Sequence, residues 1–357
     1  MWILLWLGLV LLIAAFWLAP EYAERRVYPH VLVEADTLSE VADVGDEVVF
    51  RCRMTNPSRL PCPRVVLSMQ LPEELAAALG SEERNVRVET YLLPRQTADI
   101  RITVYAVRRG VARWNQAELQ FTDMFGLRKS DRTVYTQAQV IVRPSRRVSD
   151  GASPLMNELI GELRTQRFYQ EDPSLFTGVR PYSRGDSMRA VSWFATARTG
   201  ELMVKQFGYT TESRVLLLLS GQMHEAFWKI PQRDVIDELC EQAMQLTDRM
   251  IGERTSVGLL TNLTDGLGGD RYLSPEPGLV QRERIANRLG SLSLHPALSL
   301  ADLLRSAARI IRPGETLVLL TAFQDEEAEK ALAELKRMHP SVYAYPNAHR
   351  EEVARTR

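Results

Sequence analysis

The sequence has few cysteines, no strong excess of one charge, and ordinary amounts of glycine and proline. Its three cysteines, Cys52, Cys62 and Cys240, are too few for a disulfide scaffold and lack the spacing of a zinc site. The formal net charge of -1 argues against a dedicated nucleic-acid-binding protein, which usually carries a basic excess. With 25% charged and 45% hydrophobic residues, the composition excludes a disordered chain, a collagen-like fibre and a polytopic membrane protein. The 357 residues are enough for about two folded domains.

One long hydrophobic run is present, at the start of the chain. Residues 1–19 carry no charged side chain, and at about 1.5 Å per residue they nearly span the hydrocarbon core of a bilayer. Trp2, Trp6 and Trp17 lie near its ends, where tryptophan rings favour the membrane interface. We therefore predict a single-pass transmembrane anchor at residues 1–20, placed in the inner (cytoplasmic) membrane.

A cleaved signal peptide is the alternative to this anchor. Such a peptide needs a basic segment before the hydrophobic run, and none precedes it, although small residues around Ala19 keep cleavage open. Arg25 and Arg26 follow the run closely, and the rule that basic residues stay inside predicts that the remaining domains are cytoplasmic.

Residues 30–143 contain short apolar runs separated by turn residues. The segments 48–54, 65–69 and 100–105 are typical of strands, and this spacing predicts an antiparallel β-sandwich. No catalytic set is visible here, so we interpret this domain as a spacer or interaction module. Cys52 and Cys62 would pair in an oxidising compartment, whereas in the cytoplasm Cys52 would be a small strand hydrophobe.

A polar linker with a short helix is predicted at 144–175, followed by a distinctive segment at 176–210. Pro181 and Gly185 predict a turn. Asp186 would cap a helix that carries Arg189, Trp193 and Ala197 on one face and stops at Gly200. The candidate site comprises Arg180, Tyr182, Gly185, Asp186, Arg189, Trp193, Arg198 and Lys205.

Two interpretations of this segment remain open. In the architectural one, Asp186 caps the helix and pairs with an arginine, which fixes the loop. In the functional one, the basic residues form a surface that recognises acidic groups or phosphates of a partner. Catalysis is not expected, because no nucleophile with a nearby base is present.

Residues 211–357 alternate between buried strands and helices. The apolar runs at 214–219, 256–260 and 316–320 are typical of strands covered on both faces. Helices at 232–251, 282–289, 300–311 and 326–338 lie between or after them, which predicts a doubly wound, mostly parallel sheet. The glycine-rich stretch at 261–277 lacks the end of a Walker loop and is predicted to be a mobile surface loop.

The 176–210 segment resembles the signature of the domain of unknown function 58 family. The matching residues are Arg180-Pro181-Tyr182, Gly185-Asp186, Arg189, Trp193, Ala195, Ala197, Arg198, Leu202 and Lys205. Arg109-Gly110 is similar too, as is Asp123-Met124-Phe125-Gly126-Leu127, where the family usually has proline at the second position. The resemblance covers nearly the whole chain and implies a von Willebrand factor A-like fold for the C-terminal domain.

That fold implies a metal site after its first strand, with the motif Asp-x-Ser-x-Ser. The corresponding positions here are Ser220, Gln222 and His224, so the carboxylate that attracts a hard cation is missing. We therefore predict no metal and no cofactor. His224 is not expected to bind zinc, because no second histidine or cysteine lies at ligand spacing.

These features predict a non-enzymatic, membrane-anchored scaffold for protein interaction. Proteins similar to this one are often paired with MoxR-type AAA+ ATPases, so the resemblance implies such a partner in the assembly or maturation of other membrane or envelope proteins. The alternative is an adhesion or ligand-binding module that depends on a divalent metal. A hydrolase is disfavoured, because no Ser, His and Asp have a recognisable catalytic setting.

Overall fold

The computed structural model describes Trp6, Gly8, Leu18 and Gly161 together with residues 21–81, 83–123, 126, 128–145, 171–209, 213–229 and 231–346. Most of the predicted anchor at 1–20 and most of the predicted linker, including its short helix, lie outside these residues. In the part of the chain that is described, no helix is both long and apolar enough to cross a membrane. Two units are present: Met1–Ser145 with Leu289–Leu292, and Arg146–Arg288 with Ser293–Arg357.

The first unit is a β-sandwich, as predicted. One sheet has the strand order β1-β3-β7-β5 and the other the order β2-β9-β8-β4-β6. The strands are β1 (Leu32–Thr37), β2 (Val41–Asp43), β3 (Glu47–Thr55), β4 (Cys62–Gln70), β5 (Leu75–Ala76), β6 (Asn85–Leu92), β7 (Thr97–Ala106), β8 (Gly110–Thr122) and β9 (Lys129–Arg143). The prediction of purely antiparallel pairing is wrong for one pair, because β2 runs parallel to β9.

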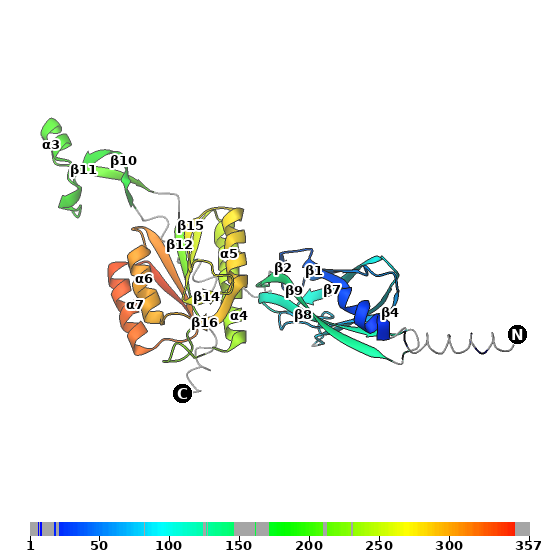
Figure 1. The fold of residues 1–357 in the computed structure, drawn as a ribbon. Helices are drawn as coiled ribbons and strands as arrows, with labels where there is room; N and C mark the ends of the chain where they lie inside the picture. The colour runs from blue at the N-terminus through cyan, green and yellow to red at the C-terminus, as the bar shows by residue number, and fades with distance from the viewer. Residues whose placement is uncertain are drawn as a thin grey trace. The chain divides into compact units, whose positions relative to one another are not determined.

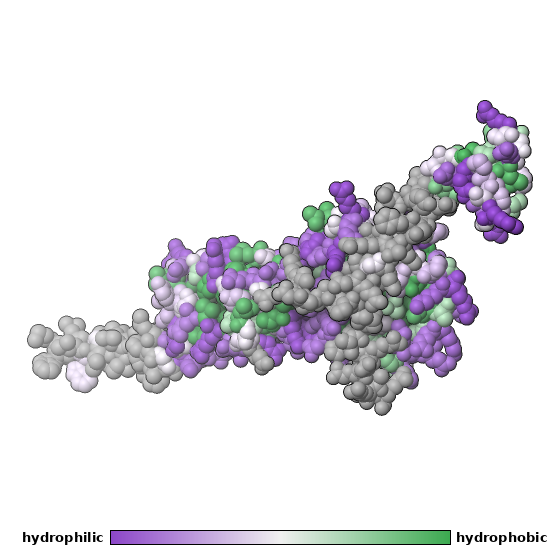
Figure 2. Space-filling model, turned by 180° about the vertical axis from the view of Figure 1, so that it is seen from behind, coloured by the Kyte–Doolittle hydropathy of each residue, from purple (hydrophilic) through white to green (hydrophobic). Residues whose placement is uncertain are grey.

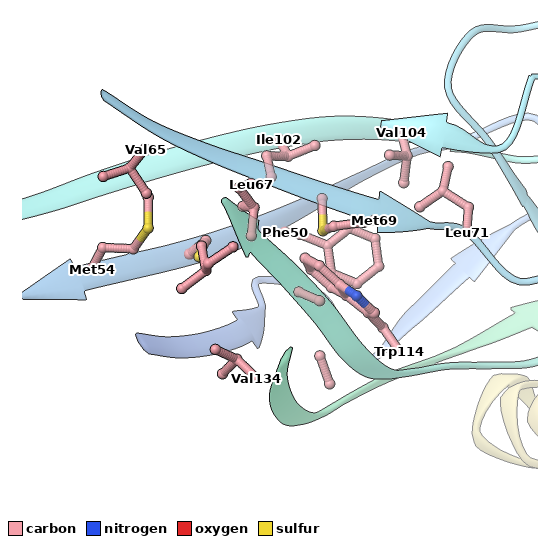
Figure 3. Close-up of a cluster of buried hydrophobic side chains, with 14 of the residues drawn as sticks. Phe50, Met54, Val65, Leu67, Met69, Leu71, Ile102, Val104, Trp114 and Val134 are labelled. Atoms are coloured by element: carbon pink, nitrogen blue, oxygen red, sulfur yellow. The ribbon is translucent and has the colours of Figure 1, made fainter. Parts of the chain in front are cut away.

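Alternating side chains fill the space between the two sheets. In β3 every second residue from Val48 to Met54 is buried, as the period of a strand requires. Figure 3 shows Phe50 against Trp114, and their rings meet edge to face at 4.9 Å. The indole of Trp114 donates a hydrogen bond to the Gln116 carbonyl at 2.8 Å, so its polar atom is satisfied inside the core.

Cys52 and Cys62 belong to this core as free thiols. Of the two alternatives raised by the sequence, the structure shows Cys52 as a small buried hydrophobic residue and no disulfide to Cys62. Burial raises the pKa of each of these thiols to about 11, because desolvation disfavours the thiolate.

The second unit contains a five-stranded sheet in the order β15-β13-β12-β17-β18. Strands β12 (Arg214–Ser220), β13 (Ser256–Thr261), β17 (Glu315–Thr321) and β18 (Val342–Pro346) are parallel, and β15 (Tyr272–Glu276) is antiparallel at one edge. Figure 1 shows α6 (Leu300–Ile310) and α7 (Glu326–Met338) on one face of the sheet and α4 (Arg233–Gly252) and α5 (Leu279–Ser291) on the other. The predicted parallel α/β architecture is therefore confirmed, with one antiparallel edge.

The glycine-rich stretch at 261–277 is not the simple loop that we predicted. It contributes β14 (Leu263–Asp265), which pairs with β16 (Leu292–Pro296), and it ends in the edge strand β15. The Asp265 carboxylate accepts hydrogen bonds from the Leu267 and Gly269 amides, which closes the turn between them. Gly258 allows the edge strand to approach, since a Cβ there would lie 2.7 Å from the Leu273 carbonyl.

Residues 171–209 form a separate two-stranded sheet, here called the arm. Strands β10 (Glu171–Pro181) and β11 (Met203–Tyr209) pair antiparallel, and the short 3-10 helix η2 (Met188–Ala190) and helix α3 (Trp193–Thr199) connect them. The predicted linker therefore ends earlier than expected, because its last residues, from Glu171, already belong to β10. Every candidate residue of the 176–210 segment lies in this arm.

Candidate functional sites in the arm and at the sheet edge

The turn that follows β10 is held by one ion pair. Both terminal guanidinium nitrogens of Arg180 donate to the carboxylate of Asp186 at 2.7 Å, and the Ser183 amide donates to it at 2.8 Å. Gly185 takes the positive φ of 115° that the turn needs. The hydrogen bond from Arg180, followed by that from Ser183, lowers the pKa of Asp186 to about 2. The predicted turn and the predicted pairing of Asp186 with an arginine are both confirmed.

The helix that we predicted to begin at Asp186 does not exist as one element. The Asp186 carboxylate accepts from Arg180 and from the Ser183 amide before it, and the N-cap positions of η2 and α3 are Ser187 and Ser192. The Ser187 hydroxyl instead accepts from the Arg189 amide at 3.4 Å in the short η2 turn. Val191 then adopts an extended conformation and pairs with Val204. Arg189 therefore lies before α3 and does not share a helical face with Trp193.

Helix α3 is fixed at its C-terminal end. Gly200 has a left-handed φ of 80°, and its amide donates to the Thr196 carbonyl at 2.9 Å, which confirms the predicted stop. The Thr196 hydroxyl accepts from the Met203 amide at 3.0 Å, so the helix is joined to β11. The Tyr182 amide, just after β10, donates at 2.8 Å to the carbonyl of Leu202, just before β11.

The arm leaves several large apolar side chains in solvent. Helix α3 buries none of its residues, and Trp193 and Phe194 are 66% and 83% exposed. Phe176, Tyr182 and Met188 are exposed as well, and hydrophobic and hydrophilic residues lie next to each other on the arm at the upper right of Figure 2. We missed Phe194 in the sequence, although two adjacent aromatic residues at the start of a short helix signal that both cannot face one core.

Positive charge accompanies these aromatic residues. Residues 176–207 contain five basic side chains, at positions 180, 184, 189, 198 and 205, and two acidic ones, at 186 and 201. Arg180 pairs with Asp186, and among the described residues Arg184, Arg189, Arg198 and Lys205 make no ion pair. All four of these cations are exposed, and Lys205 lies on β11 opposite Val179.

The second candidate site lies at the carboxyl ends of the parallel strands, here called the sheet edge. Ser220, the last residue of β12, accepts hydrogen bonds from the Asn262 amide group at 3.2 Å and from the Gln222 backbone at 3.3 Å. Asn262, which follows β13, also accepts from the Gly221 amide at 2.9 Å and donates to the Leu298 carbonyl at 3.1 Å. Our sequence analysis did not identify Asn262, although its place directly after a buried strand was a usable signal.

The side chain of Gln222 connects three segments at this edge. Its amide nitrogen donates to the His224 carbonyl at 2.9 Å and to Asp325 at 3.0 Å, and its oxygen accepts from the Leu300 amide at 2.6 Å. Leu300 begins α6, and Asp325 is the N-cap of α7. Gln222 is 1% exposed; its hydrogen bond with Leu300 is buried, and those with His224 and Asp325 are partly buried.

The side chains at the sheet edge do not fit the divalent cation that the resemblance to the von Willebrand factor A-like fold implies. Asp325 is the acidic residue in the network, and its oxygens already accept from the Ala328 amide at 2.7 Å and from Gln222. Ser220 is likewise engaged, and His224 is exposed at the surface. Among the described residues no group of three His, Cys, Asp or Glu side chains could hold a metal ion. A hard cation needs several free oxygens, carboxylates above all, and this edge does not supply them.

Comparisons with known proteins bear on the two units separately. No curated protein matches the chain. Among solved structures, a CARDB domain from Pyrococcus furiosus, in complex with di-metal ions, is 8% identical, with 31% of this chain and 94% of that chain covered and a TM-score of 0.20. A non-cellulosomal cohesin from Archaeoglobus fulgidus is 11% identical, with 31% and 90% covered and a TM-score of 0.19. Likenesses this low say nothing about function.

The family comparison covers most of the arm and most of the α/β unit. Residues 178–339 match the family described as "Protein of unknown function DUF58". This range includes the candidate residues from Arg180 to Lys205 as well as Ser220, Gln222 and His224. The protein therefore carries a DUF58 family domain at residues 178–339.

Proposed function

We propose that this protein is a non-enzymatic scaffold that docks other proteins through the arm. The observation that carries the proposal is the exposure of Trp193 and Phe194 on a helix that buries no residue. Exposed aromatic residues beside arginine are typical of the centres of protein interfaces. We further propose that the docked partner is a MoxR-type AAA+ ATPase and that the pair acts in the assembly or maturation of other proteins.

The chemistry of the sheet edge supports a role without catalysis or metal. In a doubly wound sheet, ligands bind at the carboxyl ends of the strands. At this edge the side chains of Ser220, Gln222 and Asn262 hydrogen-bond to the protein itself. We propose a von Willebrand factor A-like fold for the α/β unit, in which this edge has become structural. The parallel strands β13, β12, β17 and β18 support the assignment.

The docking proposal is tested by capture of a purified MoxR-type ATPase with the full-length protein. Trp193→Ala is expected to weaken capture about tenfold or more, because an interface loses a large aromatic anchor. Trp228→Ala is the matched control, since Trp228 is 70% exposed and lies outside the arm. Equal capture by both variants would exclude the arm as the docking surface, and a large drop in the unfolding midpoint of Trp193→Ala would make its role architectural.

The membrane anchor is also a proposal, because it depends on the uncharged run at residues 1–19. We propose a single pass through the inner membrane with the folded units in the cytoplasm. Deletion of residues 1–20 is expected to move the protein from the alkali-washed membrane fraction to the soluble fraction. Protease treatment of intact spheroplasts should leave the folded units uncut, and cleavage from the outside would reverse the orientation.

A further inference from the structure

The arm is not stabilised by a core of its own. Over residues 176–207, Val191 and Val204 are its buried hydrophobic residues, at 5% and 3% exposure. A two-stranded sheet is marginal in water, and so is a helix of seven residues. The aromatic side chains on this small element are therefore available to pack against another surface.

The charges of the arm indicate what kind of surface that is. Elsewhere in the described chain, some exposed cations are neutralised, as in the pairs Arg64–Glu89, Arg284–Glu276 and Arg305–Glu327, and others, such as Arg59 and Arg84, are not but lie apart from exposed aromatic pairs. In the arm only Arg180 has such a partner, and Arg184, Arg189, Arg198 and Lys205 make no ion pair with any described residue. Glu171 and Asp172 begin the arm, but over residues 176–207 the four exposed cations have one remaining acid beside them, Glu201, so this part of the arm attracts negative charge.

We propose that the arm recognises an acidic protein segment, which lays an apolar side chain on Trp193 and Phe194 and carboxylates beside Arg198 and the other cations of the arm. This inference rests on the proposed docking function and specifies its chemistry. Arg198 follows Phe194 by four residues on α3, so the cation and the ring lie on the same side of the helix. Arginine binds a carboxylate through two parallel hydrogen bonds, as Arg180 already does with Asp186 inside the arm.

A protein segment fits the arm better than a phosphate or a lipid surface does. The cations are distributed over the turn, η2, α3 and β11 rather than gathered in one loop, which suits an extended chain of carboxylates. Trp193 and Phe194 are adjacent in sequence and are followed by Thr196 and Thr199, so α3 lacks the continuous apolar face of a membrane-surface helix.

The test measures binding of a fluorescent synthetic peptide of glutamate with interspersed leucine to the full protein in neutral-lipid nanodiscs. A peptide with glutamine in place of glutamate is the control ligand. We expect the acidic peptide to bind and the amide peptide to bind at least about tenfold more weakly. Equal binding of the two peptides would overturn the proposal, and so would binding to phosphatidylglycerol vesicles without binding to the acidic peptide.

Charge-reversal variants test the arm itself. The double variant Arg189→Glu with Arg198→Glu is expected to lose at least about tenfold in affinity for the acidic peptide. Arg59→Glu with Arg84→Glu changes the net charge equally in the β-sandwich, where both residues are exposed, and should bind as the unaltered protein does. Unchanged affinity in the arm variant would overturn the inference. If that variant still captured the ATPase while Trp193→Ala did not, the docking function would stand and its acidic specificity would fall.

Discussion

The arm and the carboxyl edge of the α/β sheet both carry the unusual polar residues of this sequence, but they use them in opposite ways. At the sheet edge, Ser220, Gln222 and Asn262 point inward and satisfy one another and the backbone. In the arm, one ion pair fixes the turn, and the remaining cations and aromatic rings face solvent. Hydrogen-bonding capacity that is used internally builds structure, whereas capacity left at the surface is available to a partner.

The largest effect is expected from removal of the Gln222 side chain, which connects three segments at the sheet edge. Gln222→Ala leaves the buried Leu300 amide and the partly buried Asp325 carboxylate without one of their partners. We expect a loss of about 2–4 kcal/mol in the free energy of unfolding, measured by urea denaturation. Gln206→Ala, in the exposed part of the arm, is the control and should change it little. A small loss at Gln222 would mean that the network is not structural.

The stability of the turn in the arm is expected to depend on pH, because an ion pair holds it. The folded pKa of Asp186, about 2, lies below its ordinary value of 3.8. The ion pair therefore stabilises the turn above the ordinary value, and this contribution is lost as the pH falls from about 4 towards 2. Tryptophan fluorescence should report loosening of the arm over this range. Asp186→Asn should remove this transition while unfolding of the α/β unit stays unchanged, and an identical acid profile in that variant would contradict the assignment.

Divalent cations should have little effect at the sheet edge. Because the oxygens there already accept hydrogen bonds, Mg²⁺ or Mn²⁺ is expected to leave the thermal midpoint of the protein unchanged. Scanning calorimetry and titration calorimetry measure the midpoint and the heat of binding. Saturable binding that disappears in Ser220→Ala would instead favour the metal-dependent adhesion module.

The smallest effect is expected at the cysteines. All three are buried free thiols, and burial raises the pKa of Cys52 and Cys62 to about 11. The native protein should therefore react with iodoacetamide at neutral pH far more slowly than the urea-unfolded protein does. Mass spectrometry counts the modified thiols, and rapid labelling without denaturant would show that the sandwich core opens.

The regular parts of the fold could be predicted because their signals are local. The uninterrupted apolar run from Val215 to Leu219 marks a strand covered on both faces, and Gly200 marks a helix end through its positive φ. Residue alternation in β3 likewise predicts the sandwich. The parallel pairing of β2 with β9 could not be predicted, because it joins segments about a hundred residues apart.

The sequence identified most residues of the candidate sites but not their backbone conformation or their contacts. Asp186 has a side chain suited to a helix N-cap, and local sequence favours that role. In the arm the Asp186 carboxylate instead pairs with Arg180, and the extended Val191, which pairs with Val204, separates η2 from α3. At the sheet edge the missing carboxylate was visible in Ser220, Gln222 and His224. The contact of Gln222 with α6 and α7 was not visible, because it depends on tertiary structure.

The side chain that connects the first strand of the α/β unit to α6 is a carboxamide, that of Gln222. A carboxamide neither gains nor loses a proton in the physiological range, and it has no need of an ion from solution. We therefore expect the hydrogen bond between Gln222 and the start of α6 to be insensitive to chelators, to magnesium supply and to moderate acidification. The contact of Gln222 with α6 thus depends on no ion and no titrating group, whereas the turn of the arm depends on the charge of Asp186.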